Sequence, residues 1–235
     1  MSYLNVSSGA VVSELPGAQR AGFVRRTYLT LAVAIAAFAG LTTYFLSLGW
    51  GMTALQLLQG SSWSWLIVLA AFMGVGVLAD RWARSDTSRN TQMAGLGLYV
   101  VAEALIFLPL LQGAMMFAPG AIENAAVMTV ALVTALTCVV FVTRKDFSFL
   151  GPALMVGGVL ALGVIVCAIL FEIQLGFYFS VVMVVFAAGV LLYNTSNILH
   201  TYREDQHMAA ALGLFASIAL MFWYLVQVFM SFVND

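Results

Sequence analysis

Seven long apolar stretches follow one another along this 235-residue chain, separated by short polar gaps. A bilayer core about 30 Å thick needs roughly 20 helical residues, which is close to the length of each stretch. Their apolar character is continuous and lacks the alternation of period two that marks the wall of a membrane β-barrel. We therefore predict membrane-spanning helices over residues 27–49, 63–79, 91–112, 125–143, 150–171, 177–199 and 208–233.

The composition indicates the same fold class. Hydrophobic residues make up 63% of the chain and charged residues only 8%, which leaves too little polar surface to cover a soluble domain. We expect an all-α membrane protein in which residues 27–235 form a single seven-helix transmembrane domain. Residues 1–26 are expected to be a mobile cytoplasmic tail, and the formal net charge of -1 argues against nucleic-acid binding.

The basic residues predict the orientation of the bundle. Cytoplasmic loops carry an excess of lysine and arginine, and here every basic residue lies in the N-terminal tail or in every second gap. We therefore expect the N-terminus in the cytoplasm and the C-terminus outside. The nine basic residues are Arg20, Arg25, Arg26, Arg81, Arg84, Arg89, Arg144, Lys145 and Arg203.

Small residues indicate which helix is central. Helices in a bilayer associate by close backbone approach, which small side chains four residues apart allow. The first, fifth and seventh stretches each carry such a row. The row in the seventh stretch, Ala209, Gly213 and Ser217, is widened by neighbouring alanines, so we expect this helix to be surrounded by others.

Glu103 is the one ionisable residue deep inside a predicted span, about 18 Å along its helix. Hydrocarbon disfavours the charged form, and no basic residue is expected at that depth. We therefore expect Glu103 to be largely protonated near neutral pH. It could act as a proton-sensitive gate or cation ligand, or as a neutral hydrogen-bond donor that fixes two helices together.

Two further positions could line an ion path with Glu103. The sixth stretch ends in the polar run Tyr193–Asn197, which could form a vestibule or simply the solvated end of a helix. Ser217 lies at a depth similar to Glu103, although a hydroxyl there is usually satisfied by a carbonyl of its own helix. Our candidate residues for an ion path or pH sensing are Glu103, Asn194 and Ser217.

No motif predicts an enzyme, a cofactor or a metal centre. The two histidines, His200 and His207, flank a predicted inner loop, and no nucleophile, base and orienting group are expected together in the membrane. Cys138 and Cys167 lie in apolar stretches without metal-ligand spacing. A retinal protein needs a lysine in its last helix, yet the single lysine, Lys145, lies in a gap.

Three segments, residues 144–151, 193–202 and 209–229, resemble the Bax inhibitor family, also called the transmembrane Bax inhibitor motif family. Residues 23–28 resemble its bacterial, protease-modulator-like branch. The resemblance implies two three-helix layers around a central C-terminal helix, in a bacterial inner (plasma) membrane. It also implies kinship with proteins described as pH-sensitive calcium leak channels and, in some bacteria, as modulators of FtsH-type membrane proteases.

The chain departs from the calcium-leak members at two positions. Those members carry an Asp after the Tyr of the sixth span and another in the seventh, where this chain has Asn194 and Ser217. Two neutral side chains cannot share a proton or bind a divalent cation as two carboxylates can, so Glu103 would be the substitute. We expect a leak-type or homeostatic membrane protein for calcium or protons; the alternative is an interaction protein that modulates an FtsH-type protease.

Overall fold

The computed structural model describes residues 11–60, 62–84 and 88–234, and within them the chain forms eight α-helices and a short 3₁₀ helix, η1. All of the α-helices except α2 are long and apolar enough to cross a membrane, which confirms the predicted seven-helix class. The elements are η1 (Val12–Glu14), α1 (Gly17–Ser47), α2 (Trp50–Gln59), α3 (Ser62–Ala83), α4 (Arg89–Phe117), α5 (Ala121–Thr143), α6 (Leu150–Leu170), α7 (Gly176–His200) and α8 (His207–Asn234).

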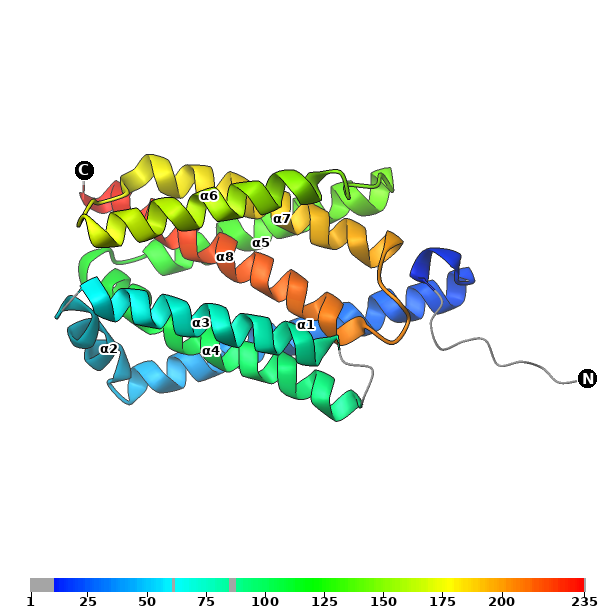
Figure 1. The fold of residues 1–235 in the computed structure, drawn as a ribbon, viewed down its shortest axis with the longest axis horizontal. Helices are drawn as coiled ribbons and strands as arrows, with labels where there is room; N and C mark the ends of the chain where they lie inside the picture. Colours follow the sequence, from blue (N-terminus) through cyan, green and yellow to red (C-terminus); the bar gives the residue numbers. More distant parts are fainter. Residues whose placement is uncertain (1–10, 61, 85–87, 235) are drawn as a thin grey trace, which may run out of the picture.

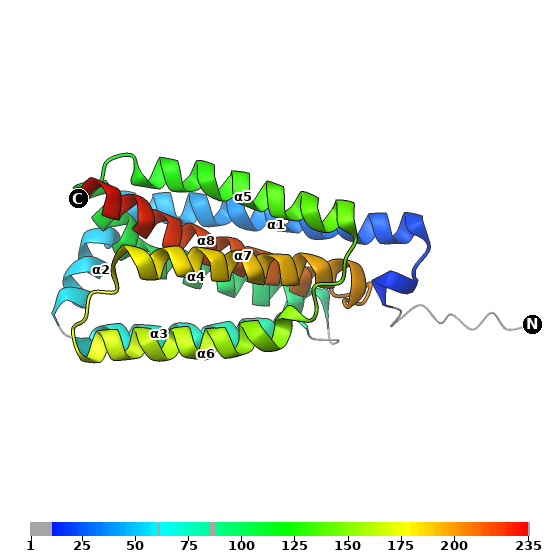
Figure 2. The ribbon, with the colours of Figure 1, turned by 90° about the horizontal axis from the view of Figure 1, so that it is seen from above.

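The membrane helices form two layers with α8 between them (Figures 1 and 2). In one layer α4 packs between α1 and α3, and in the other α7 packs between α5 and α6. Helix α8 contacts α1, α3 and α4 on one side and α5 and α7 on the other. This arrangement confirms the expected pair of three-helix layers around a central C-terminal helix.

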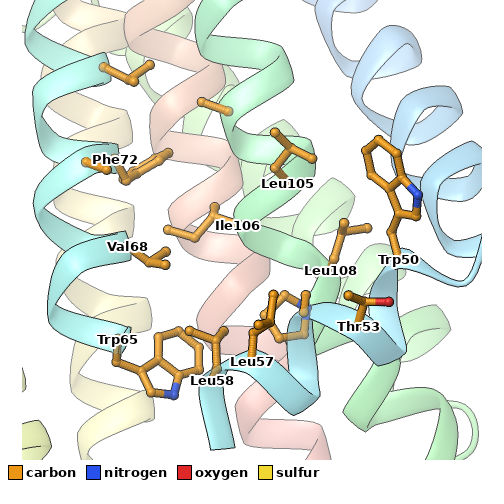
Figure 3. A pocket seen from close by; sticks show the side chains of 15 residues that line it. Trp50, Thr53, Leu57, Leu58, Trp65, Val68, Phe72, Leu105, Ile106 and Leu108 are labelled. Carbon is orange, nitrogen blue, oxygen red and sulfur yellow. The ribbon is translucent and has the colours of Figure 1, made fainter. Parts of the chain in front are cut away.

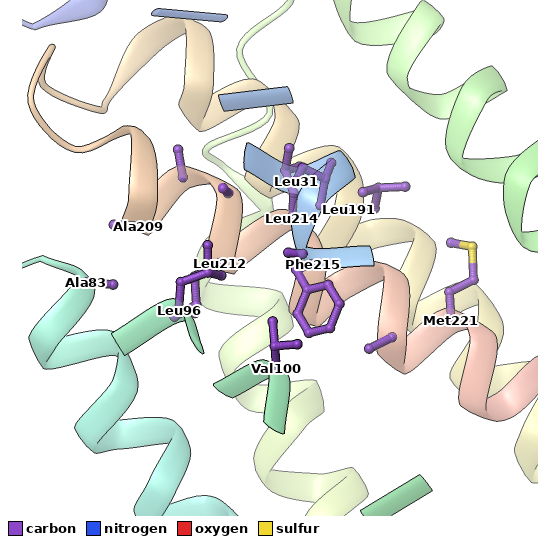
Figure 4. Close-up of a cluster of buried hydrophobic side chains, with 14 of the residues drawn as sticks. Leu31, Ala83, Leu96, Val100, Leu191, Ala209, Leu212, Leu214, Phe215 and Met221 are labelled. Carbon is purple, nitrogen blue, oxygen red and sulfur yellow. The ribbon is translucent and has the colours of Figure 1, made fainter. Parts of the chain in front are cut away.

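Burial follows the small residues of α8. In its most apolar 18-residue window 67% of the residues are buried, against 50% in α4 and 22% or less in the other spans. Ala209, Ala210 and Ala211 are almost fully buried, so neighbouring helices approach the α8 backbone closely. Figure 4 shows Leu212 and Phe215 of α8 among buried side chains from surrounding helices.

Helix α1 begins at Gly17, ten residues before the predicted start at position 27. The preceding segment packs against the connection between α7 and α8, where the Val12 amide donates to the Tyr202 carbonyl at 2.9 Å. The Arg20 guanidinium donates back to the Ser13 carbonyl at 2.6 Å. These bonds fix the start of α1 outside the apolar stretch. Residues 1–10 of the expected mobile tail lie outside the described residues, and the mobility of the tail stays a prediction.

Helix α2 was not predicted, because its ten residues are too short to span a bilayer. It follows Gly49, whose φ of 79° lies in the left-handed region that glycine adopts without strain. The helix packs against α1, α3 and α4 at the end of the bundle opposite the start of α1. It therefore covers one end of the α3–α4 layer.

The α3–α4, α5–α6 and α7–α8 connections lie at the end of the bundle where α1 starts (Figure 1), and each carries charged residues next to it or within it. The Arg84 guanidinium bonds to the exposed Asp80 carboxylate at 2.8 Å and lies 5.8 Å from the centroid of the Tyr202 ring. Arg26 approaches Glu204 at 3.7 Å. Exposed pairs of this kind contribute little to stability. The chain segments that carry the basic residues thus lie at one end of the bundle, as their places in alternating gaps predicted.

Candidate functional site

The three predicted site residues line one cavity in the middle of the bundle. The cavity has a volume of about 550 Å³ and is bounded by α3, α4, α6, α7 and α8. Glu103 comes from the middle of α4, Asn194 from α7 and Ser217 from α8. The helix order therefore brings together residues that lie far apart in the sequence. Their role in ion passage or pH sensing stays a prediction.

Glu103 is the carboxyl group of this cavity and is only 5% exposed. Tyr99 precedes it by one helical turn and lines the same cavity. Tyr99 in turn packs against Phe72 of α3, with ring centroids 5.8 Å apart. Among the described residues that line the cavity none is basic, so the carboxyl group has a phenol beside it and no counter-ion.

Asn194 and Ser217 bond to each other. The Asn194 amide donates to the Ser217 hydroxyl at 2.7 Å and to the Gly213 carbonyl at 3.0 Å. The Ser217 hydroxyl donates to the same carbonyl at 2.7 Å, which is the bond within its own helix that its position suggested. The two neutral side chains thus fasten α7 to α8 while they face the cavity.

A further polar pair lies on the same wall and was not predicted from the sequence. Gln227 of α8 lines the cavity and accepts a hydrogen bond from the Ser180 hydroxyl of α7 at 3.0 Å. The sequence signal that could have indicated this pair is Gln227 itself, an amide side chain inside an otherwise apolar stretch. The cavity therefore contains one carboxyl group and several neutral polar groups within a largely apolar lining.

The polar run at the end of α7 is mainly structural. Thr195 and Ser196 are fully buried, and of the run only Asn194 lines the cavity. The Ser196 hydroxyl accepts a hydrogen bond from the Phe147 amide at 2.9 Å, which holds the connection between α5 and α6 against α7. The run is therefore mostly buried, and a vestibule formed by Asn194 stays a prediction.

The α5–α6 connection also has its own local turn. The Asp146 carboxylate accepts a hydrogen bond from the Ser148 amide at 2.8 Å. This bond favours the charged form and lowers the pKa of Asp146 below its ordinary value. Residues 144–151, one of the three segments that carry the family resemblance, are thus held by two hydrogen bonds, one to Ser196 and one to Asp146.

A groove of about 550 Å³ lies next to the central cavity and shares part of its lining. Figure 3 shows the side chains that line this groove. It is lined by apolar side chains of α2, α3 and α4, including Leu57, which is 68% exposed. Trp65 and Phe72 of α3 and Ile106 of α4 line both spaces. These three side chains therefore separate the lipid-facing groove from the cavity that contains Glu103.

Comparison with known proteins identifies the family. The sequence model of the family described as inhibitor of apoptosis-promoting Bax1 matches residues 20–234, which is nearly the whole chain. The chain belongs to the Bax inhibitor family. It is therefore a multi-pass membrane protein of that family, as the sequence resemblance and the arrangement of its helices both indicated.

Similar proteins come from bacteria and from a plant. The modulator of FtsH protease YccA of Escherichia coli is 28% identical over 87% of this chain and 88% of its own length. A second E. coli strain has the same match under the name inner membrane protein YccA. An uncharacterized protein of Pseudomonas aeruginosa is 29% identical over 88% of both chains, and LIFEGUARD 4 of Arabidopsis thaliana is 31% identical over 46% of both.

Proposed function

We propose that this chain is a non-enzymatic protein of the bacterial inner membrane that modulates an FtsH-type membrane protease. The observation that carries the proposal is similarity over 87% of the chain to a protein named as such a modulator. The central site supports it, because Asn194 and Ser217 are neutral and bond to each other. A pair of this kind lacks the charge that a divalent-cation path needs.

The proposed orientation places the start of α1 in the cytoplasm and the end of α8 outside. The excess of basic residues at the α1 end supports this orientation. Charged groups at that end, such as Arg26 and Glu204, would then face the same compartment as the basic connections. Reporters fused to the two termini are expected to give signals from different compartments, and signals from one compartment would contradict the orientation.

The test of the proposed function is degradation of a membrane-protein substrate in proteoliposomes that contain a purified FtsH-type protease. Addition of this protein is expected to change the degradation rate several-fold, because the proposed modulator acts directly on the protease complex. The control is an unrelated seven-helix protein at the same density. An unchanged rate, together with no co-purification of the protease, would exclude the proposal.

A second candidate function is a cation or proton leak. The observation that favours it is that Glu103, Asn194 and Ser217 share one cavity in the middle of the bundle. In the same proteoliposomes loaded with a calcium-sensitive dye, a leak would give calcium influx above that of protein-free vesicles. Influx that falls in Glu103→Gln and not in the exposed Glu123→Gln would support it. No influx at either acidic or neutral pH would remove this candidate.

A further inference from the structure

The walls of the central cavity are rich in aromatic rings. Seven of its lining side chains carry aromatic rings, among them Trp65 and Phe72 of α3, Phe107 of α4 and Trp223 of α8. Phe107 and Trp223 meet edge to face, with ring centroids 5.0 Å apart. The faces of such rings attract cations electrostatically, and they do so best where water is excluded. The cavity therefore suits a positively charged group as well as apolar surface.

The lining of the cavity contains one carboxyl group. Glu103 is its acidic residue, and no basic residue stands among the described residues of the lining. A buried carboxylate needs a compensating positive charge, which the lining does not supply. A ligand with a single positive charge would neutralise Glu103, whereas an anion would meet a like charge without a partner.

An inorganic divalent cation fits the same space poorly. Calcium takes six to eight oxygen ligands in most protein sites. The Gln227 amide oxygen and the Ser217 hydroxyl oxygen already take part in hydrogen bonds with protein groups. A volume of about 550 Å³ also exceeds what a single metal ion fills and matches the size class of small-molecule pockets.

The neighbouring groove gives lipid-soluble molecules a route to this cavity. It opens on apolar side chains such as Trp50 and Leu57, which are 47% and 68% exposed. Trp65, Phe72 and Ile106 line both the groove and the central cavity, and Figure 3 shows them in the wall of the groove. A molecule dissolved in the bilayer would pass these shared side chains to reach Glu103, without crossing the polar ends of the bundle.

We propose that the central cavity binds a monovalent lipophilic organic cation, such as a protonated amine or a quaternary ammonium or phosphonium ion. Its charge pairs with the Glu103 carboxylate, and its apolar groups lie against the rings of Phe72, Phe107 and Trp223. When the ligand enters, Glu103 releases its proton to water, so the occupied cavity stays neutral. This inference is independent of the proposed protease partner.

The proton release has a single source in the lining. The other ionisable groups that face the cavity are the phenols of Tyr99 on α4 and Tyr224 on α8, whereas the described lining residues of α3, α6 and α7 include none. Both phenols stay protonated between pH 5 and 8. Binding should therefore strengthen as the pH rises through that range, and one proton should appear per ligand bound.

The test uses the whole protein in nanodiscs of uncharged phosphatidylcholine, with tetraphenylphosphonium as the probe. Trp65 and Trp223 line the cavity, so saturable quenching of tryptophan fluorescence reports occupancy. We expect Glu103→Gln to weaken binding at least about tenfold and to abolish proton release, because the amide keeps the shape without the charge. Phe72→Leu should weaken binding to a smaller extent.

Three controls make this test decisive. Glu123→Gln changes an exposed carboxylate outside the cavity and should bind the probe like the unaltered protein. The neutral triphenylphosphine oxide should bind equally to the unaltered protein and to the Glu103→Gln variant. Unchanged thermal unfolding of Glu103→Gln shows that its fold is intact, and Phe72→Leu provides a second variant. Equal affinity of Glu103→Gln for the cation, or quenching that never saturates, would overturn the proposal.

Discussion

Replacing Gly95 by leucine should lower the free energy of unfolding by about 3 kcal/mol, because there is no space for a side chain between α3 and α4. A Cβ atom at Gly95 would lie 2.7 Å from the Ala79 carbonyl oxygen and 2.8 Å from the Ala83 amide nitrogen. Both are backbone atoms, which cannot move aside by changing a rotamer. The two helices would have to separate, and the fully buried Ala79 and Ala83 would lose their contacts.

The matched control for this substitution lies two residues away on the same helix. A Cβ atom at Gly97 would meet nothing within 4 Å, so Gly97→Leu should leave stability unchanged or raise it by up to about 1 kcal/mol through helix propensity. Unfolding of both variants in mixed micelles, titrated with SDS and followed by circular dichroism, measures the difference. An equal loss of unfolding free energy in both variants would show that α3 and α4 pack less closely at Gly95 than the structure describes.

The seven spans and the central helix could be predicted because hydrophobicity and small residues are local signals. The alanines around Ala209 and Gly213 indicated a surrounded helix, and α8 is indeed the most buried span. The α3–α4 contact was missed, although Ala79 and Ala83 are four residues apart. The predicted span ended at Ala79, so half of this pair lay outside the apolar stretch.

The remaining features depend on contacts between distant segments. Helix α2 is held by packing against three other helices, and its ten residues alone give no signal of a span. Counting residues along the two helices predicted that Glu103 and Ser217 lie at a similar depth. It did not predict that Gln227 lines the same cavity. The bond from Asn194 to Ser217 requires the relative rotation of α7 and α8, which a sequence pattern does not specify.

Replacing Asn194 by aspartate is expected to lower the free energy of unfolding by about 3 kcal/mol at neutral pH. The Asn194 amide donates to the Gly213 carbonyl at 3.0 Å and to the Ser217 hydroxyl at 2.7 Å. A carboxylate cannot donate, so it would face the carbonyl oxygen as a second acceptor. It would also place a negative charge in the cavity of Glu103, where no described lining residue is basic.

Acid should restore much of this loss, because a protonated aspartate can donate one of the two hydrogen bonds. The folded state then holds the proton more firmly than the unfolded state does, so stability of Asn194→Asp should fall as the pH rises from 5 to 8. Thermal unfolding at several pH values measures this slope. The control is Asn124→Asp, at an exposed position in the first turn of α5. A negative charge there should leave the free energy of unfolding unchanged or raise it slightly.

The outcome at Asn194 also bears on the two candidate functions. If the cavity is largely dry, as its aromatic lining suggests, the charge is unfavourable and the loss is large. A cavity that fills with water would solvate the carboxylate, and Asn194→Asp would then unfold like Asn124→Asp at every pH. That second result would favour the leak path over protease modulation, because ions need the same water to cross the middle of the bundle.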